Sequence, residues 1–286
     1  MRRIFPIQAW MLLSALLIGC THDKQPTTQP LAPAPSPNQQ TASASRAHAT
    51  TQPAKLADLK GNYHLHLPGI GGYRNIDRRA IAGLRDGDLD GVIDHYDWTV
   101  ADPGLGALLA RKRNGDEALN VAQIILERRR ADPNARITLT AHSGGCGILA
   151  WALEHLPDDV SVDSVAFLSP ALSPTYDLSK ALRHVKKNAY VIYSSHDVAV
   201  LGIGTSLFGT IDGIKTEAAG KVGFVEPKNA DPAQYAKLHQ FPYDRSWMKL
   251  DNIGDHIGSL SRPFIRDIVA PLLTQGRLPA TQPTTN

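Results

Sequence analysis

The chain has little net charge and few cysteines. Its 30 lysines and arginines nearly balance its 27 acidic residues, which leaves a formal charge of +3. Residues 1–19 contribute Arg2 and Arg3 and no acid, so the remainder carries only +1. That balance offers no basic field for nucleic acid. Two cysteines could form at most one disulfide, but Cys20 has a better explanation given below. We then expect Cys146 to be a small packing residue.

The amino terminus also lacks an apolar run long enough for a comfortable membrane span. Two arginines precede an apolar stretch from Ala9 to Ile18, which is typical of a secretory signal. The following Gly19-Cys20, with Leu17 and Ile18 before it, resembles the bacterial lipobox, whose cysteine is lipidated and becomes the first mature residue. We therefore expect a signal peptide over residues 1–19 and a lipid anchor on Cys20. The anchor would hold the protein in the cell envelope, on the extracytoplasmic side of the outer or cytoplasmic membrane. An ordinary signal peptide and an uncleaved anchor are the alternatives.

Residues 20–55 are poor in large apolar side chains and rich in Thr, Gln, Pro, Ala and Ser. Such a segment cannot bury enough apolar surface to fold, and it is predicted to be a disordered tether. The tail, residues 278–286, has a similar composition and the same prediction. The folded domain is therefore expected over residues 56–277.

Apolar, β-branched runs alternate with amphipathic stretches through that domain. The sequence predicts strands over residues 62–67, 91–98, 136–141, 162–168 and 189–194, with 222–225 as a further candidate. Predicted helices cover residues 75–84, 116–130, 148–156 and 257–273. This alternation predicts an α/β fold, a mostly parallel, doubly wound sheet of about six strands with helices on both faces.

The segment from residue 137 to 156 carries the strongest motif. A buried strand passes at once into a helix, and Ala141-His142-Ser143-Gly144-Gly145 lies at the turn. Ser143 is flanked two residues away on each side by a small residue, as a nucleophile elbow requires, with alanine in place of the usual first glycine. The alternative is a glycine-rich turn of a nucleotide-binding sheet, in which Ser143 has no special role.

Three more loops follow predicted strands or precede the last helix. They contain Pro68-Gly69-Ile70-Gly71-Gly72, Asp197 and His256, and function gathers at such strand ends. The chain order Ser143, Asp197, His256, with the elbow and the glycine-rich loop, resembles the α/β-hydrolase family. The resemblance implies that Ser143 is the nucleophile, His256 the general base and Asp197 the orienting acid. It also implies an oxyanion hole formed by the backbone N–H groups of Gly144 and Ile70.

The chain departs from that family at several points. Pro68-Gly69 replaces the usual His-Gly, and the family's early antiparallel strands are not predicted. The segment between Ser194 and His239 is long, and we interpret it as a cap or substrate loop, with a plain surface insertion as the alternative. His239, on a predicted edge strand over residues 237–241, is the rival base. Two carboxylates, Asp177 and Asp255, are the rival acids. The side chains of His142 and His66 are expected to line the cleft or pack.

The run from Asp86 to Asp97 resembles an EF-hand calcium loop. Asp86, Asp88 and Asp90 occupy the first, third and fifth positions, Gly91 the sixth and Asp97 the twelfth. The last ligand is Asp where Glu is usual, and a strand is predicted where a flanking helix is required. This makes calcium binding a minor hypothesis beside a plain Asp/Gly turn.

The function expected from these features is hydrolysis of a carboxylic ester, or a related acyl bond, through an acyl-enzyme on Ser143. The expected substrate is a small acyl or ester compound, with no metal or organic cofactor and no nucleic acid. The protein is expected to be a monomer. The alternative is a non-catalytic lipoprotein of the cell envelope that uses the same fold to bind a ligand or partner.

Overall fold

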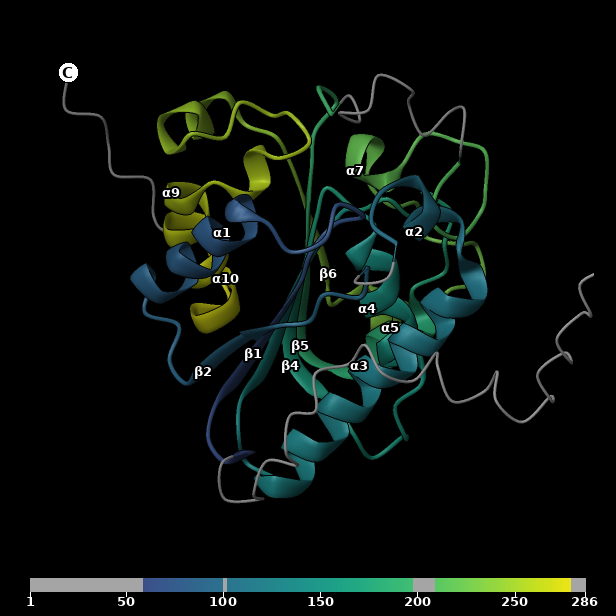
Figure 1. Cartoon of the computed structure of the whole chain (residues 1–286), viewed down its shortest axis with the longest axis vertical. Helices are drawn as coiled ribbons and strands as arrows, with labels where there is room; N and C mark the ends of the chain where they lie inside the picture. The colour runs from purple at the N-terminus through teal and green to yellow at the C-terminus, as the bar shows by residue number, and fades with distance from the viewer. Residues whose placement is uncertain (1–58, 100–101, 198–208, 279–286) are drawn as a thin grey trace, which may run out of the picture. The chain divides into compact units, whose positions relative to one another are not determined.

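The computed structural model describes residues 59–99, 102–197 and 209–278 (Figure 1). The expected signal peptide, Cys20, the tether, residues 198–208 of the proposed cap and nearly all of the tail lie outside these ranges. Within them, every helix is too short or too polar to traverse a lipid bilayer.

Six strands form one sheet in the order β2-β1-β3-β4-β5-β6. All five pairings between neighbouring strands are parallel. The strands are β1 (Tyr63–Leu67), β2 (Val92–His95), β3 (Ile137–His142), β4 (Val162–Leu168), β5 (Val185–Tyr193) and β6 (Leu238–Pro242).

Helices cover both faces of this sheet (Figure 1). Helices α1, α9 and α10 lie on one side, and α3, α4 and α5 lie on the other. The helices and helical turns are α1 (Asn75–Asp86), α2 (Leu105–Leu109), α3 (Arg111–Ala131), α4 (Gly145–Glu154), α5 (Ser179–Arg183), α7 (Ala219–Val222), α8 (Pro232–Tyr235), the 3-10 turns η3 (Arg245–Leu250) and η4 (Gly258–Leu260), α9 (Arg262–Phe264), the π-helical turn η5 (Ile265–Val269) and α10 (Ala270–Gln275). The predicted fold class, a doubly wound parallel sheet with helices on both faces, is confirmed.

Alternate side chains of the central strands belong to two separate apolar cores. On β4, Val165 and Phe167 join the core beneath α3 and α4, whereas Ala166 and Leu168 join the core beneath α9 and α10. This follows from the two-residue period of a strand, which sends successive side chains to opposite faces. A parallel strand covered on both faces reads as a continuous buried run, as β4 does apart from Asp163.

The strand order places a topological switch point between β1 and β3. From β1 the chain goes outward to β2, and then returns past β1 to β3. At such a switch point, the loops that leave neighbouring strands run to opposite faces of the sheet, and open α/β sheets typically bind their ligands there. The Pro68–Gly72 loop follows β1 and Ser143 follows β3, so both lie at the switch point.

Two of the predicted elements were wrong. Residues 222–225 do not form a strand, because α7 ends at Val222 and Gly223 has a φ of +81°. The amide of Phe224 then donates to the Gln240 side chain instead of a strand ladder. The sixth strand is β6, the predicted edge strand. The single helix predicted over 257–273 is broken into η4, α9, η5 and α10, with Ser261 capping the start of α9.

Polar side chains occupy the face of β1 and β3 beneath α1. His64 lies 2.8 Å from the Thr138 hydroxyl and 3.0 Å from that of Thr140. His66 lies 2.8 Å from the Thr140 hydroxyl and 3.1 Å from an Asp77 carboxylate oxygen on α1. All five residues are buried. Hydrogen bonding to one another is what makes burial of these polar groups tolerable.

The buried imidazole of His64 should make stability depend on pH. Burial, with a smaller effect of the neighbouring His66, lowers the pKa of His64 from 6.5 to about 3. Below pH 6.5 the imidazole takes up a proton in the unfolded chain but not in the folded chain. The free energy of unfolding therefore decreases as the pH is lowered from 6.5 to about 3. One such group contributes a slope of about 1.4 kcal/mol per pH unit. We expect His64→Gln to show a shallower slope between pH 6.5 and 5 in urea unfolding. Parallel slopes for the two proteins would contradict this.

Candidate active site

Ser143 forms the corner between β3 and α4. Its φ is +52°, in the left-handed region that residues other than glycine seldom adopt. Its amide donates to the Leu168 carbonyl at 3.0 Å, and its carbonyl accepts from the Cys146 amide at 3.1 Å. These bonds hold the strained corner between the sheet and the first turn of α4. The structure thus forms the strand–turn–helix corner that the sequence predicts, and strain of this kind is typical of functional sites.

The loop after β1 packs tightly against this corner. A Cβ placed on Gly145 would lie 2.4 Å from the Pro68 carbonyl oxygen, and one on Gly69 would lie 3.2 Å from Ser143 Cβ. The indole of Trp98 donates to the same Pro68 oxygen at 2.8 Å, which fixes the loop from its other side. Glycine is therefore required here by close approach of two backbones.

This contact gives a prediction about two glycines at helix positions. Gly145→Ala should lower the free energy of unfolding by about 1–3 kcal/mol, because the new methyl group meets backbone that cannot move aside easily. Gly115→Ala is the matched control, since nothing lies within 4 Å of its Cβ position in α3. It should stabilise by up to about 1 kcal/mol. Urea unfolding of both variants checks this, and equal effects would refute it.

Three side chains from distant parts of the chain meet at the carboxyl edge of the sheet. His256 Nε2 lies 2.9 Å from Ser143 Oγ. On the other side of the ring, His256 Nδ1 lies 2.9 and 3.0 Å from the two carboxylate oxygens of Asp197. The side chains of Asp197 and His256 are 7% and 17% exposed, so the pair is shielded from bulk water. The structure brings together the nucleophile, base and acid that the sequence proposes.

The rival residues lie elsewhere or have other partners. His239, on the edge strand β6, lies 2.9 Å from the Asn188 side-chain oxygen. The Asp177 carboxylate accepts from the Ser179 amide and the Tyr235 hydroxyl. The Asp255 carboxylate accepts from the backbone amide of Gly258, which shapes the loop.

Gly144 and Ile70, the expected oxyanion donors, lie side by side. A Cβ on Gly144 would be 2.7 Å from Ile70 Cγ2. In the described part of the chain, neither residue gives its backbone N–H to an acceptor. The Ile70 carbonyl accepts from the Gly104 amide at 2.6 Å, which holds the loop in place. Both residues therefore lie beside the corner that carries Ser143.

The sequence predicts that His142 lines the cleft or packs, but it gives no sign of the contact that His142 makes with the segment of His256. His142 is buried, and its Nε2 lies 2.8 Å from the backbone oxygen of His256. Its ring centroid is 4.9 Å from that of His256. Adjacency to Ser143 was the only signal in the sequence, and it does not reveal a contact with a carbonyl 114 residues away.

The calcium hypothesis is not supported, because three of its four candidate carboxylates, those of Asp86, Asp90 and Asp97, have separate protein partners. Asp86 forms an ion pair with Arg262, which holds the pKa of Asp86 below its usual value. Asp90 is paired with Arg136, while Asp97 accepts from the Tyr73 and Thr99 amides. Asp88, the remaining candidate, has a φ of +59°. Among residues 59–99, 102–197 and 209–278, no three His, Cys, Asp or Glu side chains gather as metal ligands would.

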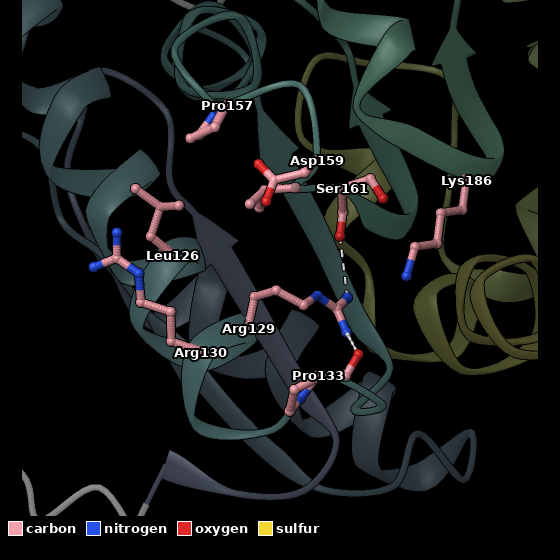
Figure 2. A pocket seen from close by; sticks show the side chains of 9 residues that line it. Leu126, Arg129, Arg130, Pro133, Pro157, Asp159, Ser161 and Lys186 are labelled. Carbon is pink, nitrogen blue, oxygen red and sulfur yellow. Dashed lines mark hydrogen bonds between the residues drawn. The ribbon is translucent and has the colours of Figure 1, made fainter.

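A surface pocket of about 390 Å³ lies at the opposite end of the strands, where β4 and β5 begin (Figure 2). Arg129 crosses it and donates to the carbonyls of Pro133 and Ser161 (Figure 2). It also donates to the carbonyl of Ala135. Its guanidinium thereby joins the end of α3 to the start of β4. This pocket is separate from the site at Ser143.

No protein-family model and no curated protein matches the sequence. Solved structures that resemble the chain include a provisionally assigned hydrolase of the alpha/beta superfamily from Xanthomonas campestris pv. campestris, with 16% identity, 71% of this chain and 96% of that chain covered, and a TM-score of 0.41. The ydeN gene product from B. subtilis has 16% identity, coverage of 75% and 99%, and a TM-score of 0.41. A cutinase-like protein from Cryptococcus sp. has 16% identity, coverage of 76% of this chain and 91% of that chain, and a TM-score of 0.36. All three TM-scores lie below 0.5, so the interpretation of function rests on the geometry of the site itself.

Proposed function

We propose that the protein is a serine hydrolase that cleaves a carboxylic ester, or a related acyl bond, through an acyl-enzyme on Ser143. One observation carries the proposal. A serine hydroxyl on a left-handed strand–helix corner contacts one imidazole nitrogen, and a buried carboxylate contacts the other. The carboxylate fixes the tautomer with the proton on Nδ1, so that Nε2 is free to accept from the serine.

In the first half of the reaction, Ser143 Oγ attacks the acyl carbon and its proton passes to His256 Nε2. Asp197 stabilises the imidazolium that forms. The backbone N–H groups of Gly144 and Ile70 donate to the oxyanion of the tetrahedral intermediate. The C–O bond to the leaving group then breaks, and His256 returns the proton to that oxygen. In the second half, a water oxygen attacks the acyl carbon while His256 takes a proton from that water. The bond between the acyl carbon and Ser143 Oγ then breaks, His256 returns the proton to Oγ, and the carboxylic acid leaves.

The test is labelling combined with turnover. The protein should take up one fluorophosphonate per chain, measured by intact mass, with the adduct on the peptide that contains Ser143. It should also hydrolyse p-nitrophenyl esters, and a series of graded chain length would define its acyl preference. A protein that is neither labelled nor active on this panel would instead be the non-catalytic binding protein.

We further propose that Cys20 anchors this domain, as a monomer, to a membrane of the cell envelope. The lipobox-like sequence before Cys20 and the proline-rich segment after it support this. Radiolabelled palmitate should be incorporated into the protein in a bacterial host, and the protein should sediment with membranes. Cys20→Ala should abolish incorporation while purified protein keeps its esterase activity. Incorporation into the variant would refute the assignment.

A further inference from the structure

His142 is a buried imidazole that takes no part in the acyl-transfer steps. It is the last residue of β3 and lies directly before Ser143. Its Nε2 is 2.8 Å from the backbone oxygen of His256. A carbonyl oxygen can only accept, so the proton of His142 is on Nε2 and the ring donates. The residue beside the nucleophile is thus bonded to the main chain of the base.

We propose that His142 is a positioning residue, whose hydrogen bond to the His256 carbonyl sets the distance between the general base and Ser143. This inference rests on the proposed function. His142 acts through the main chain of His256, which leaves both ring nitrogens of His256 for Ser143 and Asp197.

The need for such a bond follows from the irregular segment that carries His256. His256 lies between the 3-10 turns η3 and η4. Asn252 accepts from the Gly254 amide and Asp255 from the Gly258 amide, which are local bonds that shape the loop. Beyond His256, the Ser259 hydroxyl lies 3.1 Å from that of Ser169, which follows β4. The bond from His142 joins the loop to β3 at the catalytic residue itself.

The surroundings of His142 suit a neutral donor. The charged or titratable groups that influence the pKa of His142 are His256, Asp77 and His66. Burial, followed by the effect of nearby His256, lowers the pKa of His142 to about 3. The ring therefore stays neutral when His256 receives the serine proton, although the two ring centroids are only 4.9 Å apart. A positively charged group at that distance would oppose the imidazolium.

Two substitutions separate positioning from packing. His142→Gln can place an amide N–H near the position of Nε2, whereas His142→Leu fills similar space without a donor. We expect His142→Leu to lower kcat for p-nitrophenyl esters about 10- to 100-fold with little change in KM, since small displacements of a catalytic group are costly. His142→Gln should keep kcat within a few-fold of the wild type. If the leucine variant does not fold, His142→Asn, polar but too short to reach the carbonyl, replaces it.

The downfield proton of His256 Nδ1 in the NMR spectrum gives a readout independent of turnover. It should be retained in His142→Gln and lost or broadened in His142→Leu or His142→Asn. Wild-type kcat and an unchanged proton signal in the variant without a donor would overturn the positioning role, as would equal losses in the glutamine and donor-free variants. Failure of the proposed function looks different, because the wild type itself would then be inactive and unlabelled.

Discussion

Ser143→Ala is expected to abolish ester hydrolysis, with kcat lower by about 10⁶-fold. Removal of the hydroxyl leaves no atom to form the acyl-enzyme, while Gly144, Ile70 and His256 remain in place. Alanine adopts the same backbone, so we expect the free energy of unfolding to change by no more than about 1.5 kcal/mol, the usual contribution of one hydrogen bond. Spectrophotometric assays with p-nitrophenyl esters measure kcat, and parallel urea unfolding measures the free energy of unfolding.

The matched control for this variant is Ser195→Ala. Ser195 is an exposed serine just after β5, and its hydroxyl takes no part in the proposed reaction. It should keep wild-type turnover and take up one fluorophosphonate per chain. Retained hydrolysis in Ser143→Ala would contradict the mechanism. Loss of labelling in Ser195→Ala, with labelling retained in Ser143→Ala, would also contradict it.

Asp197→Asn is expected to lower kcat by about 10⁴-fold with little change in KM. Asparagine keeps the shape of the side chain, but its amide group can donate to His256 Nδ1. The imidazole proton would then move to Nε2, which could no longer accept from Ser143 at 2.9 Å. Initial rates over a range of ester concentrations separate kcat from KM.

Asp177→Asn is the control for Asp197→Asn, because the sequence offers Asp177 as an alternative to Asp197 as the orienting acid. Its carboxylate accepts from the Ser179 amide and the Tyr235 hydroxyl, away from His256. Activity should stay near that of the wild type. A severe loss in Asp177→Asn together with an active Asp197→Asn would reverse the assignment.

The local and topological features of the site could be predicted from the sequence. The corner at Ser143 depends on a buried strand and small neighbours within ten residues, all visible in the printed chain. The meeting of Asp197 and His256 with Ser143 follows because parallel strands bring their carboxyl ends to one edge. The choice of His256 over His239 rested on position, because Gly254 and the following helix place His256 on a loop whereas His239 lies on a predicted edge strand.

Features that depend on distant partners could not be predicted. The run of aspartates from Asp86 matches a calcium loop locally, but Arg262 pairs with Asp86 from 176 residues away. The apolar run at 222–225 resembles a strand, but the amide of Phe224 donates to the side chain of Gln240, a partner that local sequence does not reveal. The bond from His142 to a main-chain oxygen leaves no trace in side-chain patterns.

The distance along the chain between Ser143 and His256 has a consequence during synthesis. The nucleophile is made 113 residues before the base that activates it, and the base lies beyond β6, the last strand to join the sheet. A growing polypeptide would therefore present an unreactive hydroxyl until almost the whole domain has left the ribosome. Under the proposed chemistry, hydrolytic activity would therefore appear only in molecules in which the segment carrying His256 has docked beside Ser143.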